Sequence, residues 1–180
     1  MQFHAIDSAA PEAFPSLVIE PGKTYYVEHD HPGSGRFLAL KIAGAIKGKE
    51  IAWINYHMPG NNPVTRHGIT YIRSGTPDGM EKAIDNLDKN TTRVVIAPDL
   101  RDGSRVHFVG RANFAHESRH LIKLVLLMRA IAGKEGVVII TEWRGSRVPE
   151  SVIPLADRYT LNGNGKKRPF ELSKKTSAVN

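Results

Sequence analysis

The sequence predicts a single domain of the α/β class, with three layers in which helices flank a mostly parallel central sheet. Short apolar runs, which are typical of strands, alternate along the chain with longer segments of helical periodicity. The run Val137–Thr141 is almost entirely apolar, as expected for a strand that is covered on both faces of a parallel sheet. The length of 180 residues suits one hydrophobic core. We therefore place the domain at residues 1–173 and expect 174–180 to form a flexible basic tail.

Seven segments are predicted to be strands from their short apolar runs and their β-branched and aromatic residues. In chain order they are Thr24–Glu28, Ile51–Tyr56, Gly68–Ile72, Thr92–Ala97, Val137–Thr141, Leu155–Leu161 and Pro169–Ser173. The last two are expected to close the sheet as a C-terminal β-hairpin, because an Asn-Gly-Asn-Gly turn signal lies between them.

Helical periodicity predicts three helices. Arg36–Lys47 has a broad apolar side and is followed by Gly48, a residue type that commonly ends helices. Met80–Leu87 follows a Thr-Pro-Asp-Gly turn, and Phe114–Ala132, the longest periodic segment, ends before Gly133. Three segments are expected to be loops: His31–Gly35, Pro59–Pro63 and the basic segment Leu100–Ala112.

Composition excludes several classes of protein. The absence of cysteine rules out disulfides, thiol catalysis and cysteine-based zinc or iron–sulfur centres. No apolar run approaches the ~20 residues that span a bilayer, and residues 1–12 lack the basic start and apolar stretch of a signal peptide. We expect a cytoplasmic protein with no membrane partner.

The positive charge is unevenly distributed. The formal net charge is +7, from 25 Lys and Arg residues against 18 Asp and Glu residues. The first 35 residues contain five acidic residues and one lysine, so the remaining chain carries a net charge of +11. A basic body of this size favours a polyanionic partner, and we expect that partner to be nucleic acid.

The turn after the first predicted strand has the position and the glycines of a phosphate-binding loop. Such a loop reads Gly-x-x-x-x-Gly-Lys-Ser/Thr: its backbone amides and lysine bind phosphate, and its hydroxyl binds Mg²⁺. Here Gly33, Ser34 and Gly35 keep the backbone part. Arg36 stands at the lysine position, and Phe37, which has no ligating atom, stands at the hydroxyl position.

The same loop carries negative charge. Asp30 stands at the first glycine of the pattern, and Glu28 lies two residues earlier. Both carboxylates are expected to lie near the phosphate position, where they would oppose nucleotide binding. We therefore expect a degenerate nucleotide site with at most weak ATP binding, and no required cofactor.

In the order of its segments, the chain resembles the RecA-like ATPases, the core shared by recombinases, KaiC-type proteins and DnaB-type replicative helicases. The resemblance extends from about Leu17 to Ser173 and implies a three-layer RecA-like core that self-associates. In the first half of the chain, the matching segments are Ile19–Gly22 before the first strand, the degenerate loop, and Ile51–His57 as the second strand. Val94–Asp99 then resembles the Walker B strand with its Asp, and Leu155–Leu161 resembles a late strand. Between them, Arg119–Thr141 resembles the helix and strand that precede a sensor residue, and Glu142 falls near the position of that residue.

The resemblance also implies that the parts needed for hydrolysis are missing. The second strand of the family ends near a catalytic glutamate, but Asn55, Tyr56 and His57 stand there in this chain. Asp99 remains as a potential ligand for the metal of a nucleotide, whereas Phe37 cannot ligate one. Hydrolysis needs a positioned metal and a group that activates water, so we expect no catalytic residues and no significant turnover.

Two of the predicted strand-end loops are basic. Loops that leave the carboxyl ends of parallel strands gather at one edge of a sheet and form its binding site. The two corresponding loops bind DNA in recombinases, so the resemblance implies the same role here. Arginine neutralises phosphate and tryptophan offers a stacking face to a base. The expected nucleic-acid-binding residues are Arg101, Arg105 and Arg111 in the first loop, Trp143, Arg144 and Arg147 in the second, and a later basic cluster of Lys166, Lys167 and Arg168.

A competing motif lies on the longest predicted helix. His116, Glu117 and His120 form the His-Glu-x-x-His pattern of zinc metalloproteases, with Glu135 or Glu142 available as a third ligand. Arg119, however, adds positive charge beside the proposed metal, and the segment is already explained as a helix of the RecA-like core. We expect no metal site and keep zinc as the alternative.

These observations lead to one leading hypothesis and two alternatives. The first is a RecA-like pseudo-ATPase that binds nucleic acid and serves as an accessory or regulatory factor in DNA recombination, replication or transfer. We expect the nucleic acid to be DNA. The second is an atypical Mg²⁺-dependent ATPase that uses Arg36 in place of the lysine. The third is a protein that regulates a RecA-like partner by binding it.

Overall fold

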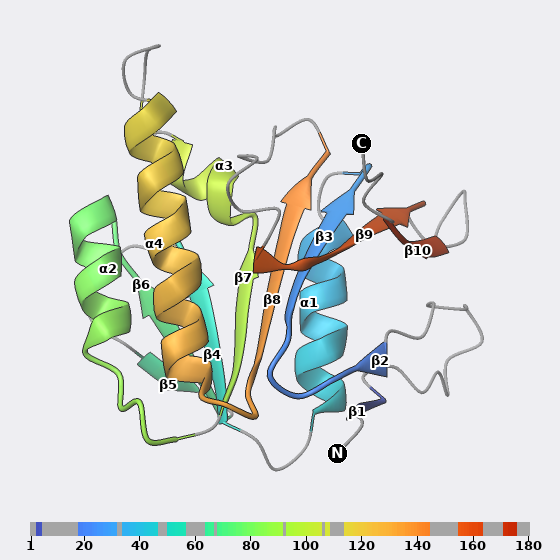
Figure 1. The fold of residues 1–180 in the computed structure, drawn as a ribbon, viewed down its shortest axis with the longest axis horizontal. Helices are drawn as coiled ribbons and strands as arrows, with labels where there is room; N and C mark the ends of the chain where they lie inside the picture. The colour runs from blue at the N-terminus through green and yellow to red at the C-terminus, as the bar shows by residue number, and fades with distance from the viewer. Residues whose placement is uncertain are drawn as a thin grey trace.

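The computed structural model describes residues 3–4, 18–31, 34–46, 50–56, 64–66, 68–91, 93–105, 107–108, 114–144, 155–163 and 171–175. Eight strands form the main sheet: β3 (Thr24–His29), β4 (Glu50–Asn55), β5 (Val64–Arg66), β6 (Ile69–Arg73), β7 (Arg93–Pro98), β8 (Val137–Trp143), β9 (Asp157–Asn162) and β10 (Glu171–Lys174). Their order is β10-β9-β3-β8-β7-β4-β6-β5 (Figure 1). The six inner strands run parallel, and β5 and β10 are antiparallel to their neighbours. The protein is therefore of the α/β class with a mostly parallel sheet, as predicted.

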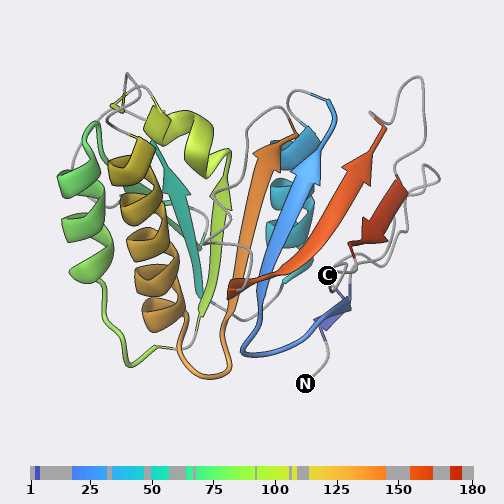
Figure 2. The ribbon, with the colours of Figure 1, turned by 45° about the horizontal axis from the view of Figure 1, so that its top comes forward.

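Helices cover both faces of this sheet. Helix α1 (Ser34–Ala45) packs on one face, and α2 (Pro77–Asp85), α3 (Leu100–Arg105) and α4 (Phe114–Ala132) pack on the other. Figure 1 shows α2 and α4 in front of the sheet and α1 behind it, and the turned view of Figure 2 gives the same arrangement. A separate two-stranded sheet pairs β1 (Phe3–His4) with β2 (Val18–Ile19).

Each face has its own apolar core. Leu38 and Ile42 of α1 are fully buried against the sheet, and Leu124 and Met128 of α4 are fully buried on the opposite face. Burial of one such side chain contributes about 1.5–3 kcal/mol, so each helix is held mainly by its apolar side. The alternation of the strands divides their residues between the two faces.

Helix α2 begins earlier than predicted, at Pro77 rather than Met80. Thr76 is its N-cap, because the Thr76 hydroxyl accepts a hydrogen bond from the amide of Gly79 at 3.2 Å. A cap of this kind is worth about 1 kcal/mol, and proline is well tolerated in the first turn. The Thr-Pro-Asp-Gly segment, which was expected to be a turn before the helix, therefore starts it.

Three other expectations need correction. The segment after β7 is not a loop throughout, since Leu100–Arg105 forms the short helix α3. Strand β10 extends past the expected end of the domain at 173: Lys174 belongs to β10, and the amide of Lys175 donates to the carbonyl of Arg158 at 2.8 Å. The rest of the expected tail, 176–180, lies outside the described residues. The short strands β1, β2 and β5 were not predicted. Strand β10 pairs with β9 in the antiparallel sense. Asn164 and Gly165 of the predicted turn between them lie outside the described residues.

The parallel arrangement brings the carboxyl ends of the six inner strands to one edge of the sheet, at the top of Figure 1. The neighbours β3, β8 and β7 end there at His29, Trp143 and Pro98. No helix within the described residues is long and apolar enough to span a membrane.

Candidate functional site

The side chain of His29 is the centre of the strand-end region. It is 1% exposed at the end of β3, and its Nε2 atom lies 3.0 Å from Oδ1 of Asp99, the residue that follows β7. Its Nδ1 atom lies 3.0 Å from the carbonyl oxygen of His31, and its own carbonyl accepts a hydrogen bond of 2.8 Å from the amide of Arg144. One histidine therefore joins the segments that follow β3, β7 and β8.

The start of α1 packs directly on the same ring. A Cβ atom added to Gly35 would lie 2.4 Å from two atoms of the His29 ring and 2.7 Å from Oγ1 of Thr141. Only glycine therefore fits at this position. Gly35, a glycine of the predicted phosphate loop, therefore leaves room for the ring of His29. Gly33 lies outside the described residues.

The other residues of the degenerate loop do not converge on a common point. Ser34 is buried, and its hydroxyl donates to the carbonyl of Gly163 at 3.4 Å. Arg36 is exposed, and Phe37 is 42% exposed with the ammonium group of Lys41 5.4 Å from its ring centre. The position that needs a hydroxyl ligand for Mg²⁺ is therefore an aromatic ring at the surface.

Asp99 has an unusual backbone, with a φ of 50°, in the left-handed region that few residues other than glycine adopt. Its amide donates to the carbonyl of Thr141 at 2.8 Å, and its carboxylate meets the ring of His29. The predicted Walker B aspartate is therefore engaged by protein groups on both its backbone and its side chain.

The expectation that Glu28 faces the phosphate loop is wrong. Tyr26 and Glu28 project to the α4 face of β3, whereas Val27 and His29 project to the α1 face. Glu28 is buried and receives hydrogen bonds from Arg158, at 3.0 Å, and from Lys175. Burial opposes ionisation of Glu28, but these two cations outweigh it and lower its pKa. Its charge is neutralised away from the loop.

Asp30 also serves a structural contact. It is exposed, and its carboxylate accepts a hydrogen bond of 3.1 Å from the amide of Gly163. Asp30 and Ser34 together link the segment after β3 to the end of β9.

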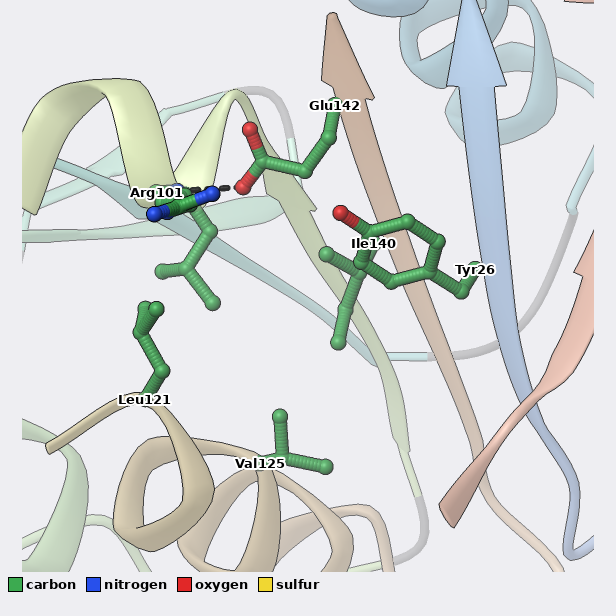
Figure 3. A pocket seen from close by; sticks show the side chains of 7 residues that line it. Tyr26, Arg101, Leu121, Val125, Ile140 and Glu142 are labelled. Carbon is green, nitrogen blue, oxygen red and sulfur yellow. Dashed lines mark hydrogen bonds between the residues drawn. The ribbon is translucent and has the colours of Figure 1, made fainter. Parts of the chain in front are cut away.

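Arg101 turns inward, which corrects its assignment to a nucleic-acid-binding loop. Its side chain is only 10% exposed, and its Nε donates to Glu117 of α4 at 3.1 Å. Its backbone amide donates to the carboxylate of Glu142 at the end of β8. Figure 3 shows Arg101 and Glu142 beside Tyr26, around a cavity of about 10 Å³ that has room for a single water molecule. Arg101 is therefore part of a buried charge cluster and not of the surface.

The turn after β8 keeps its predicted side chains at the surface. Trp143 is 45% exposed, lies in register with His29, and is followed by the exposed Arg144. No ion-pair partner of Arg144 or Arg36 occurs in the ranges that the structure describes. The remaining predicted residues, Arg111, Arg147, Lys166, Lys167, Arg168 and the side chain of Arg105, lie outside the described part.

The His-Glu-x-x-His segment is confirmed as part of α4, but its three side chains do not meet at a common point. His116 is exposed, Glu117 pairs with Arg101, and His120 is buried between Tyr56 and Glu81. Within the described ranges, no group of three His, Asp or Glu side chains has an arrangement that could hold a metal ion. The zinc alternative has no ligand set in this geometry.

A hydrogen-bonded chain of Tyr56, His120 and Glu81 is a feature that sequence reasoning missed. The Nε2 atom of His120 meets the hydroxyl of Tyr56, and Nδ1 lies 2.8 Å from Oε1 of Glu81, which also pairs with Lys123. Burial lowers the pKa of His120 and raises that of Tyr56, so both are neutral at neutral pH. The neutral ring donates from Nδ1 to the carboxylate and accepts at Nε2 from the phenol. His120 borders a groove of about 560 Å³ between α2 and α4.

The sequence matches no protein-family model and no curated protein.

Proposed function

We propose that this protein is a RecA-like domain that binds nucleic acid, with DNA as the expected partner, and that does not hydrolyse ATP. The turn of Trp143 and Arg144 is the main contact, and Arg36 at the start of α1 extends it. The protein acts as an accessory or regulatory factor in DNA recombination, replication or transfer in the cytoplasm, and the family resemblance also implies self-association.

One observation carries this proposal: an exposed tryptophan and an exposed arginine stand side by side at the carboxyl edge of the parallel sheet. Trp143 is 45% exposed although it is one of the largest apolar side chains, and Arg144 follows it directly. A base can stack on the indole while the guanidinium group contacts phosphate. The net charge of +7 supports a polyanionic partner.

The donor set at the degenerate loop does not fit a Mg²⁺-nucleotide. Phe37 offers no oxygen, and the carboxylate of Asp99 is directed to the ring of His29. At the expected place of the catalytic glutamate, Tyr56 is directed to His120. Metal-assisted phosphoryl transfer needs ligands and a group that orients water, and these side chains supply neither. The contacts therefore favour a binding role over the alternative of an atypical ATPase.

The RecA-like assignment rests on the resemblance, and the fold is compatible with it. The degenerate loop follows a buried parallel strand and precedes a helix, and the aspartate of the Walker B-like segment follows a second buried strand. Both strands end at the same edge and both contact β8.

Fluorescence anisotropy with labelled single-stranded and double-stranded oligonucleotides of one sequence tests the proposal. We expect binding that weakens as salt rises, with a slope of about 0.7 in log K against log salt for each phosphate contact to a single strand. Addition of ATP and Mg²⁺ should leave the affinity unchanged. Absence of binding to either form at low salt would contradict the proposal.

A further inference from the structure

The buried ring of His29 lies at the carboxyl ends of the strands, in the region where the resemblance to RecA-like ATPases implies a bound nucleotide. The ring of His29 lies between the first turn of α1, through Gly35, and the carboxylate of Asp99. In a working phosphate loop of this kind, nucleotide and metal join the helix start to the aspartate. Here a side chain of the protein makes that connection.

The hydrogen-bond partners of His29 support a holding role. Both ring nitrogens face oxygen acceptors, namely Oδ1 of Asp99 and the carbonyl of His31, each at 3.0 Å. A ring protonated on both nitrogens donates to both acceptors, whereas a neutral ring donates to only one of them.

The contacts of His29 reach the proposed nucleic-acid-binding turn directly. Its carbonyl accepts from the amide of Arg144, and Trp143 is its register partner on β8. On the other side, Asp99 has a left-handed backbone, a strained conformation that persists only when neighbouring contacts fix it. Two such contacts fix it: the amide of Asp99 donates to the carbonyl of Thr141, and its carboxylate meets the ring of His29.

We propose that His29 is a built-in substitute for nucleotide, a positioning residue whose imidazole holds the segments after β3 and β7 together and whose backbone carbonyl holds the turn after β8. The surface of Trp143 and Arg144 is then ready to bind nucleic acid in the absence of any nucleotide. This inference rests on the proposed function for its consequence at the surface, while the holding role of the ring can be measured without nucleic acid.

The test compares the wild-type chain with His29→Ala, with and without added imidazole at constant ionic strength. Removal of the ring opens a space of its own size and frees Asp99, so amide exchange of residues 99–100 and 141–144 should accelerate about tenfold, the effect of one or two lost hydrogen bonds. Affinity for single-stranded DNA should fall by a similar factor. Imidazole should restore both slow exchange and affinity, which a general loss of packing would not allow.

Two further variants keep the test decisive. His116→Ala removes an exposed histidine from α4, on the other face of the sheet, and should change neither exchange nor affinity. Asp99→Asn tolerates the left-handed backbone and is expected to fold, yet it weakens the contact with the ring and should accelerate exchange in the same segments by a smaller factor.

The outcomes separate this inference from the proposed function. Unchanged exchange in both His29→Ala and Asp99→Asn would overturn the holding role, as would a defect in His29→Ala that imidazole does not repair. If exchange responds as expected but the wild-type chain binds no nucleic acid, the ring holds the loops and the proposed function is wrong.

Discussion

At the carboxyl edge of the sheet, charged side chains are buried on one face and exposed on the other. On the α4 face, Arg101, Glu117, Glu142 and Glu28 are buried, and each is engaged by other groups of the chain. On the side of α1 and the turn after β8, Arg36 and Arg144 are exposed. The comparison shows that a basic strand-end loop is not by itself a binding surface, because one loop directs its first arginine into the core and the other directs its arginine outward.

The largest expected effect comes from the buried side of this comparison. Arg101→Ala should reduce the free energy of unfolding by about 3–5 kcal/mol, because it leaves the buried carboxylate of Glu117 without its cation. Chemical denaturation measures this loss.

A matched double variant checks the reason for it. Arg101→Met combined with Glu117→Leu removes both charges and should recover most of the stability. If Arg101→Ala is as stable as the wild-type chain and instead loses nucleic-acid binding, Arg101 belongs to the surface and the contrast between the two faces is wrong.

A smaller effect is expected from pH at the Tyr56–His120–Glu81 chain. Burial lowers the pKa of His120 from its ordinary value of 6.5, so the unfolded chain binds a proton more readily than the folded one. The contribution of His120 to stability is therefore complete above that value and declines as the pH falls through it. Glu81 acts in the same direction at lower pH: burial opposes its ionisation, but Lys123 and His120 lower its pKa below 4.5.

Denaturation between about pH 7.5 and about pH 5.5 tests this linkage. The wild-type chain should lose stability on acidification, and His120→Gln should lose less over the same interval. An equal pH dependence in both proteins would show that His120 titrates as freely as a surface histidine.

The smallest effect is expected at the degenerate loop. Arg36→Ala removes one exposed cation, so its affinity for single-stranded DNA should fall only about two- to fivefold, the effect of one phosphate contact. No Mg²⁺-dependent ATP turnover should be detected in either protein. Turnover in the wild-type chain that Arg36→Ala abolishes would establish the atypical ATPase instead.

The elements of the fold were accessible from sequence because they depend on periodicity. Helix α4 has the predicted bounds, and β3, β7 and β8 differ from the predicted strands by two residues or fewer. The short helix α3 was missed because its six residues include Gly103 and Ser104, which are unfavourable in helices. Its placement depends on Glu142, which accepts from the amide of Arg101, a contact between distant parts of the sequence.

The candidate site was only partly accessible. Trp143 and Arg144 were predicted to lie at this edge because strand-end loops gather there, a rule that needs no tertiary detail, and their binding role stays a prediction. The roles of His29, Glu81 and Tyr56 depend on contacts across 70, 39 and 64 positions of the chain, and no local pattern marks them. The face on which Glu28 lies could have been predicted from strand alternation. Tyr25 and Val27 lie on the apolar α1 face, so Glu28 must lie on the other face.

The exposed turn after β8 is the proposed nucleic-acid-binding surface, and removal of its two side chains tests that role. Anisotropy titrations of single-stranded DNA should compare the wild-type chain, Trp143→Ala with Arg144→Ala, and a control with Leu126→Ala and Arg129→Ala. The control removes an exposed apolar residue and an exposed arginine from α4. The first pair should weaken binding about 10- to 100-fold and reduce the salt slope by about 0.7, because one stacked base and one phosphate contact are lost. The control should bind like the wild-type chain. Equal affinity and equal salt dependence in all three proteins would contradict the account.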